Sequence, residues 1–162
     1  MLKPLLPLVA AISISACNVN PELAAMQLSV MQTPPAQLNA TQIAHLSGSL
    51  FETCRAYNLG SYANPQTKTR VAHTAADVRK LESILRRHGL TGRDLELLRS
   101  RDRSFGTGQT FRGLTCSLGY APRVNRAFYP GTGHNWQAIL GSQYVYLRGD
   151  GSETGMKVYA WN

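Results

Sequence analysis

Residues 124–161, VNRAFYPGTGHNWQAILGSQYVYLRGDGSETGMKVYAW, contain four short β-prone runs separated by turn residues. Runs of this kind predict strands over residues 124–129, 136–140, 143–148 and 156–161. Gly141-Ser142 suits a two-residue hairpin that begins with glycine. Four successive strands with short connections predict an antiparallel β-meander.

The chain before the meander has the periodicity of helices. Asn39 is a candidate N-cap with Gln42 three residues later, and the helix that follows is expected to stop near Asn58-Leu59-Gly60. Its apolar side chains recur at spacings of three and four, at Ile43, Leu46, Leu50, Cys54 and Tyr57. A polar loop carrying Pro65 is expected to follow.

Two capping patterns predict a helical hairpin. Thr74 with Asp77 begins one helix, which Gly89 ends, and Thr91 with Asp94 begins the next. The last turn of this second helix is expected to carry Arg99, Arg101 and Arg103. A short helix within 109–118 ends at Gly119. We therefore expect an α+β fold, in which helices, including the helical hairpin, pack on one face of an antiparallel β-meander of three to four strands.

The N-terminus has the order of an export signal. Lys3 precedes an apolar run over 5–14, and Ser15 and Ala16 lie directly before Cys17. Ile14-Ser15-Ala16-Cys17 resembles the bacterial lipobox, which implies a signal peptide over residues 1–16 and lipid attachment at Cys17. An ordinary secretory signal with a chance cysteine is the alternative. By the same resemblance, Asn18 after the cysteine implies the outer membrane, facing the periplasm.

Residues 17–40 are predicted to be the lipidated cysteine and a flexible tether. This stretch is rich in Ala, Gln, Pro and Asn, contains Pro34-Pro35, and lacks sustained apolar periodicity. The expected single α+β domain then covers residues 41–162, with a helical part over 41–107 and a strand-rich module over 108–162.

The chain is basic, with a formal net charge of +8 that falls to about +7 if Lys3 is removed with the signal peptide. Thirteen Lys and Arg but five Asp and Glu lie between Lys68 and Arg126. This charge is either a solvated helix surface or a contact for anionic lipid headgroups or an acidic protein patch. No nucleic-acid partner is expected, because no recognisable binding motif or aromatic interleaving accompanies the basic residues.

Cys54 and Cys116 are the cysteines that follow Cys17. An oxidising compartment permits a disulfide between them, and two buried free thiols are the other interpretation. The sequence leaves both open.

The C-terminal residues resemble the module of the SmpA/OmlA (BamE-like) envelope lipoproteins, over about 108–162. The residues that carry the resemblance are Gly108, Gly119, Pro122, Val124, Asn125, Arg126, Trp136, Tyr146 and Trp161. Their expected roles are structural: Gly119 as a helix C-cap, Pro122 at the entry to the first strand, and Asn125 bonding nearby backbone. The chain departs from the family pattern by one extra residue between Gly119 and Pro122, by His134-Asn135 before the tryptophan, and by a longer last loop.

No catalytic, cofactor or metal site is expected from the sequence. The four histidines, His45, His73, His88 and His134, are scattered and lack metal-ligand spacing with cysteine. The glycine-rich pieces 106–108 and 131–133 lack the lysine-containing context of a phosphate loop. A Cys116–His134 thiol pair is weighed and set aside, because no activating charge accompanies Cys116.

The sequence thus predicts a membrane-anchored periplasmic lipoprotein that acts as a non-enzymatic protein-binding or envelope-assembly accessory module. An inhibitor or immunity-type binder is the alternative, and it requires an exposed aromatic patch, for which Tyr129, Tyr144, Tyr146 and Trp161 are candidates. A peptidoglycan-directed enzyme is the third hypothesis, supported by location alone.

Overall fold

A computed structural model describes residues 20–100 and 105–162. The predicted signal peptide, Cys17, Arg101 and Arg103 lie outside these residues. The helices are α1 (Pro21–Gln32), the 3-10 helix η1 (Pro35–Gln37), α2 (Ala40–Gly48), α3 (Leu50–Leu59), α4 (Ala75–Arg87), α5 (Gly92–Arg99) and α6 (Phe111–Leu118). The strands are β1 (Ser61–Ala63), β2 (Arg70–Ala72), β3 (Arg123–Tyr129), β4 (Gly133–Leu140), β5 (Gln143–Gly149) and β6 (Lys157–Trp161). The expected α+β class is confirmed.

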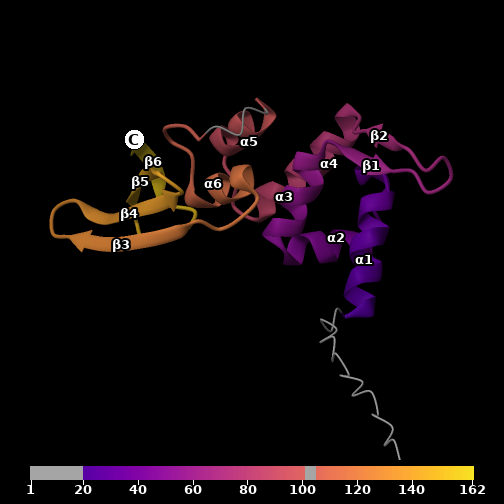
Figure 1. Ribbon diagram of the computed structural model, residues 1–162, viewed down its shortest axis with the longest axis horizontal. Helices are drawn as coiled ribbons and strands as arrows, with labels where there is room; N and C mark the ends of the chain where they lie inside the picture. Colours follow the sequence, from indigo (N-terminus) through magenta and orange to yellow (C-terminus); the bar gives the residue numbers. More distant parts are fainter. Residues whose placement is uncertain (1–19, 101–104) are drawn as a thin grey trace, which may run out of the picture.

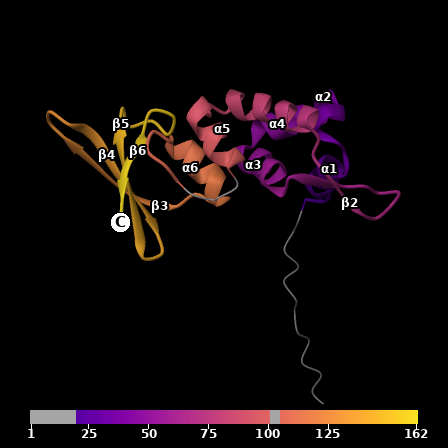
Figure 2. The ribbon, with the colours of Figure 1, turned by 90° about the horizontal axis from the view of Figure 1, so that it is seen from above.

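The molecule is elongated, with most helices at one end and the four-stranded sheet at the other (Figure 1). The view from above agrees and places α6 between the sheet and the remaining helices (Figure 2). The sheet has the strand order β3-β4-β5-β6, and every pair is antiparallel, which confirms the predicted meander. Leu140 pairs with Gln143 across Gly141-Ser142, and Gly141 has a φ of 64°, as a two-residue hairpin requires.

One face of the sheet packs on α6, and we call it the inner face. Its alternate side chains form a core with two residues of α6; the core comprises Trp136, Ala138, Val145, Leu147, Met156, Val158, Phe111 and Leu114. The Phe111 and Trp136 rings meet edge to face, with centroids 5.3 Å apart. The helical hairpin of α4 and α5 instead contributes to two further clusters with α3 and the N-terminal helices. α6 is thus the helix that the sheet buries.

The prediction of a flexible tether over 17–40 is wrong for residues 21–40. Asn20 caps α1 by accepting a hydrogen bond from the Glu22 amide (3.0 Å), and Pro21 occupies the first turn. Val30 and Leu38 are buried in a cluster with Leu46, Leu81 and Ile84. Residues 21–40 therefore belong to the folded domain, which the prediction began at residue 41. Sequence periodicity missed α1 because few of its apolar residues are buried.

Polar contacts also hold this segment to the fold. The Gln42 side chain donates to the hydroxyls of Ser29 (2.7 Å) and Thr33 (3.0 Å). Asp77 accepts from the Ala36 amide (2.8 Å), which ties η1 to the first turn of α4. Hydrogen bonds from Ala36 and Thr74 lower the pKa of Asp77 despite the opposing effect of its burial.

The predicted single helix after Asn39 is in fact two helices. Asn39 and Gln42 form the expected capping box, but the helix breaks at Ser49, whose backbone is extended (φ −139°, ψ 109°). The Ser49 side chain caps α3 by accepting from the Glu52 amide (3.3 Å). Thr53 Oγ1 donates to the Leu46 carbonyl at the break (2.8 Å), so this buried group keeps a hydrogen-bond partner.

The loop expected around Pro65 contains a small hairpin of β1 and β2. Asn64 accepts hydrogen bonds from the amides of Gln66 (2.9 Å) and Thr67 (3.2 Å), which builds the turn. Strands of three residues are too short to leave an alternating pattern in the sequence. The capping boxes Thr74–Asp77 and Thr91–Asp94 are both confirmed, as is Gly119 as the left-handed C-cap of α6.

Candidate functional site

α6 joins the helical part to the sheet, and a disulfide is one of its attachments. Cys54 of α3 and Cys116 of α6 are bonded, with their Cα atoms 5.2 Å apart and both side chains buried. Of the two interpretations that the sequence leaves open, the structure has the disulfide. Asn58 adds a hydrogen bond from its side-chain amide to the Cys116 carbonyl (2.8 Å).

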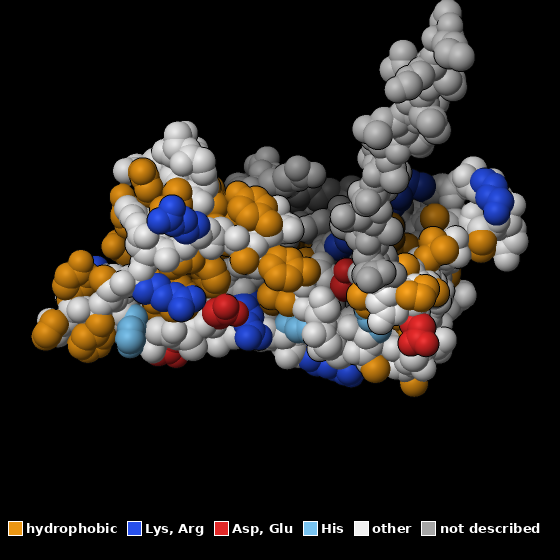
Figure 3. All heavy atoms as spheres, turned by 60° about the horizontal axis from the view of Figure 1, so that its bottom comes forward, with side chains coloured by type: hydrophobic (Ala, Val, Ile, Leu, Met, Phe, Trp, Pro, Cys, Tyr) orange, Lys and Arg blue, Asp and Glu red, His pale blue; other side chains and the backbone are white. Residues whose placement is uncertain are grey.

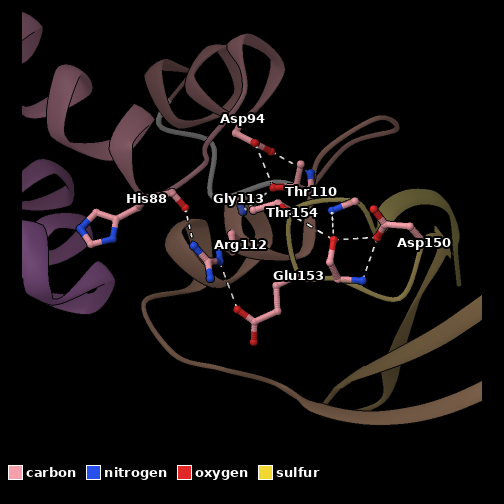
Figure 4. A network of polar contacts seen from close by, with 10 residues as sticks. His88, Asp94, Thr110, Arg112, Gly113, Asp150, Glu153 and Thr154 are labelled. Carbon is pink, nitrogen blue, oxygen red and sulfur yellow. Dashed lines mark hydrogen bonds and ion pairs between the residues drawn. The ribbon is translucent and has the colours of Figure 1, made fainter.

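A buried carboxylate makes the second attachment (Figure 4). Asp94 Oδ2 accepts from the amide (2.7 Å) and the hydroxyl (2.8 Å) of Thr91, the N-cap of α5. The same side chain accepts from the amide (2.8 Å) and the hydroxyl (3.0 Å) of Thr110, the N-cap of α6. One carboxylate therefore caps two helices, where the positive ends of both helix dipoles stabilise its charge. Gly113 is required here, because a Cβ at this position would overlap Asp94.

Arg112 makes the third attachment, at the loop between β5 and β6 (Figure 4). Its Nη1 donates to the His88 carbonyl at the end of α4 (2.7 Å), and its Nε donates to Glu153 of that loop (3.2 Å). The same loop packs on the turn after α4, since a Cβ on Gly89 would lie 2.6 Å from Thr154 Cγ2. These contacts hold the sheet in one orientation relative to the helices.

The residues of the family resemblance do not form one site. Gly108 has a φ of 84°, and Pro122 is buried just before β3. Val124 packs against the inner-face core, and the Arg126 guanidinium lies over the Trp136 ring, 4.5 Å from its centroid. Asn125 bonds the Gln137 side chain (3.0 Å) rather than nearby backbone, which corrects the expectation for it.

The proposed aromatic patch is exposed but does not lie on one face. Trp161 is 48% exposed and meets Phe105 edge to face. Strand alternation puts Trp161 and its partner Val145 on the inner side, whereas Tyr129, Tyr144 and Tyr146 lie on the opposite side of the sheet. Sequence analysis missed Tyr159, which joins these tyrosines through contact with the Tyr146 ring (centroids 6.4 Å apart).

We call the side of the sheet opposite α6 the outer face. Its residues are Arg123, Asn125, Ala127, Tyr129, Asn135, Gln137, Ile139, Tyr144, Tyr146, Arg148, Lys157, Tyr159 and Ala160. Seven of them line a shallow groove of about 310 Å³. In both ribbon views no helix of the described residues covers this face (Figures 1 and 2). Hydrophobic side chains also gather on the surface at the sheet end of the molecule (Figure 3).

A second groove, of about 670 Å³, lies between α3, α5 and α6. On its wall, Arg99 donates two hydrogen bonds to the buried carboxylate of Glu82 (2.6 and 2.7 Å), and the Tyr57 hydroxyl donates a third (3.1 Å). The hydrogen bond from Arg99 lowers the pKa of Glu82, while burial and the neighbouring Glu82 raise that of Tyr57 to about 12. Tyr57 therefore keeps its proton at neutral pH and donates it in a hydrogen bond to the Glu82 carboxylate.

The described residues contain no cluster of three or more His, Cys, Asp or Glu side chains that suits a metal ion. Cys116 is bonded to Cys54 and so has no free thiol, while His134 packs against the Phe128 ring (centroids 5.0 Å apart). Cys116 and His134 therefore do not form the thiol nucleophile considered from the sequence. None of the helices in the described ranges is long and apolar enough to cross a membrane.

Comparison of the chain with protein-family models, with curated proteins and with solved structures finds no match. The resemblance to the SmpA/OmlA module thus stays a prediction from the motif residues.

Proposed function

We propose that this chain is a lipid-anchored protein of the bacterial envelope whose domain binds another protein through the outer face of its sheet and performs no chemistry itself. The observation that carries the proposal is the composition of that face. Tyr129, Tyr144 and Tyr159 are 56%, 36% and 45% exposed, and Asn125, Asn135 and Gln137 lie between them. Tyrosine provides large contact area with little side-chain entropy, and amides adapt their hydrogen bonds to a partner.

The shape of the molecule supports this arrangement. α1 belongs to the helical end, and the sheet lies at the far end of the long axis (Figure 1). If Cys17 carries the lipid, only residues 18–20 separate it from Pro21, the first residue of α1, and the four residue steps from Cys17 to Pro21 span at most about 14 Å. The helical end would then rest at the membrane and the outer face would be presented away from it. We place the chain at the outer membrane, facing the periplasm.

An inhibitor or immunity-type binder would use the same face, so exposure of Tyr129, Tyr144 and Tyr159 supports that alternative equally. The two differ in their partner: an accessory module binds a resident envelope protein, whereas an inhibitor binds an enzyme and abolishes its activity. The peptidoglycan-directed enzyme has no support from the described residues, where no nucleophile, base and stabiliser converge.

Site-specific photo-crosslinking in intact cells tests the proposal. The full chain would carry p-benzoylphenylalanine in place of Tyr144 or Tyr159, and a matched variant would carry it in place of Arg86, which is exposed on α4. We expect one discrete crosslinked protein from both sheet positions and none from α4. Equal crosslinking from all three positions, or none from the sheet, would refute the use of this face.

Anchoring is tested separately. Wild type should carry acyl mass on a chain that starts at Cys17 and should fractionate with outer membranes, and Cys17→Ser should be soluble and unmodified. A soluble, unmodified wild type would overturn the anchor and leave the secreted binder as the better account.

A further inference from the structure

The charge on the outer face is positive and unbalanced. Arg123, Arg148 and Lys157 are its charged residues, and all three are exposed. The chain has no acidic residue between Asp102 and Asp150. Asp150 and Glu153 are the acidic side chains of residues 105–162, and both lie in the loop between β5 and β6, where Ser152 and Arg112 bond them.

Two of these cations lie directly opposite each other. Arg148 of β5 pairs in register with Lys157 of β6, on the same face. Like charges in opposed positions of an antiparallel pair destabilise it, and a Glu at either position would stabilise the fold. Arg148 contacts Asn135 and Tyr159, but no described contact requires a second cation at Lys157, and a local choice that opposes stability without a structural reason points to function.

The Arg148 guanidinium is already oriented. Its Nε donates to Asn135 Oδ1 (3.2 Å), and the group lies over the Tyr159 ring, 4.8 Å from the centroid. Among the described residues, no acceptor bonds its two terminal nitrogens. Those nitrogens form the planar pair of donors that binds a carboxylate with two parallel hydrogen bonds. Little side-chain entropy remains to be lost when such a carboxylate arrives.

The third cation lies at the opposite corner of the face. Arg123 of β3 pairs with Ile139 of β4, and Arg148 of β5 pairs with Asn135 of β4. Arg123 and Arg148 are therefore two strands apart, and their partners on β4 are four residues apart. Strand geometry separates the two by about 13 Å along the strands and about 10 Å across them. The groove lined by Asn125, Gln137, Tyr146 and Tyr159 lies between these corners.

We propose that the outer face binds an acidic segment of its partner protein, which crosses the sheet with carboxylates against the Arg148–Lys157 pair and against Arg123, and with uncharged side chains on the tyrosines between them. This inference rests on the proposed protein-binding function and names the chemistry of the partner. A second copy of this chain does not fit, because its own outer face has no acidic residue to offer to these cations. One pair of cations and a third cation at the opposite corner also match discrete carboxylates better than the continuous charge of a nucleic acid.

The test uses the purified full chain and defined probes. Dodecaglutamate is titrated at about 0.02 M and about 0.15 M salt, because exposed charges are screened over this range. Dodecaglutamine is the uncharged control. We expect the acidic peptide alone to bind, to shift the amide resonances of β3 to β6, and to bind more weakly at the higher salt.

Matched charge removals locate the site. The Arg148→Gln/Lys157→Gln variant should weaken dodecaglutamate binding by about tenfold. The control variant Arg86→Gln/Arg87→Gln removes the same charge from exposed positions on α4 and should bind as wild type does. Equal loss in both variants would mean binding to net charge only and would overturn the proposal. Circular dichroism confirms that both variants are folded.

Two further probes test other anionic partners. Tighter binding of an oligothymidylate, or of vesicles containing phosphatidylglycerol, that is lost in Arg148→Gln/Lys157→Gln would overturn the proposal in favour of a nucleic acid or a lipid surface. The crosslinker in place of Tyr144 is also tested in the Arg148→Gln/Lys157→Gln background. If it captures the same protein to the same extent there, the acidic-segment inference fails while the protein-binding function stands. Loss of crosslinking in that variant, but not in the α4 control, supports it.

Discussion

Removal of the Cys54–Cys116 disulfide should destabilise the protein by a large share of its folding free energy. The two cysteines are 62 residues apart in the sequence. In the chain-entropy description, a disulfide that closes a loop of this length lowers the conformational entropy of the unfolded chain by about 14 cal/mol/K, which stabilises the folded state by about 4.3 kcal/mol at 25 °C. Typical domains are stable by about 5–15 kcal/mol, so the loss is severe.

The single and double cysteine variants should lose similar amounts of stability. Either Cys54→Ala or Cys116→Ala abolishes the same bridge, so each single variant should lose nearly as much as the double variant. Urea unfolding of the purified full chain, followed by circular dichroism, measures the free energy of unfolding of all three. Single losses that add up to the double loss, or a double loss below about 1 kcal/mol, would refute the argument. Cys17→Ser is the control and should unfold as wild type does.

Three further predictions concern polar and apolar contacts. Asp94→Asn should cost about 2–4 kcal/mol in urea unfolding, because amide donors at two helix N-termini lose their charged acceptor; a near-neutral effect would contradict the double-capping role. Val30→Asp should destabilise the folded protein by at least about 2 kcal/mol, since it buries a charge under α1. Unchanged stability would instead support the prediction of a flexible tether. The stability that Glu82→Gln removes should be fully present above pH 4.5, the ordinary pKa of Glu, and should disappear as the pH falls through the lowered pKa of Glu82 in the folded protein. The urea midpoints of wild type and variant are compared as a function of pH. A difference between them that does not change with pH would exclude the ion pair as its cause.

Local signals carried the parts of the fold that the sequence predicts well. The capping boxes at Asn39, Thr74 and Thr91 and the glycine at position 119 were readable because each acts within three or four residues. The meander was predictable for the same reason, since hairpins join neighbours in the chain. Long-range contacts could not be decided from the sequence: whether Cys54 and Cys116 bond, which second helix Asp94 caps, and whether Val30 is buried all depend on residues more than fifteen positions apart.

For the outer face, too, local features could be predicted from the sequence and long-range ones could not. The sequence by itself determined that aromatic residues are present in the last strands, and that acidic residues are missing from them. Only the tertiary structure decided which tyrosines share a face, because that depends on strand register and on which side α6 covers. α6 packs on the side of Trp136 and Val145, where apolar area is largest, and this leaves the tyrosines, amides and paired cations of the outer face to the solvent.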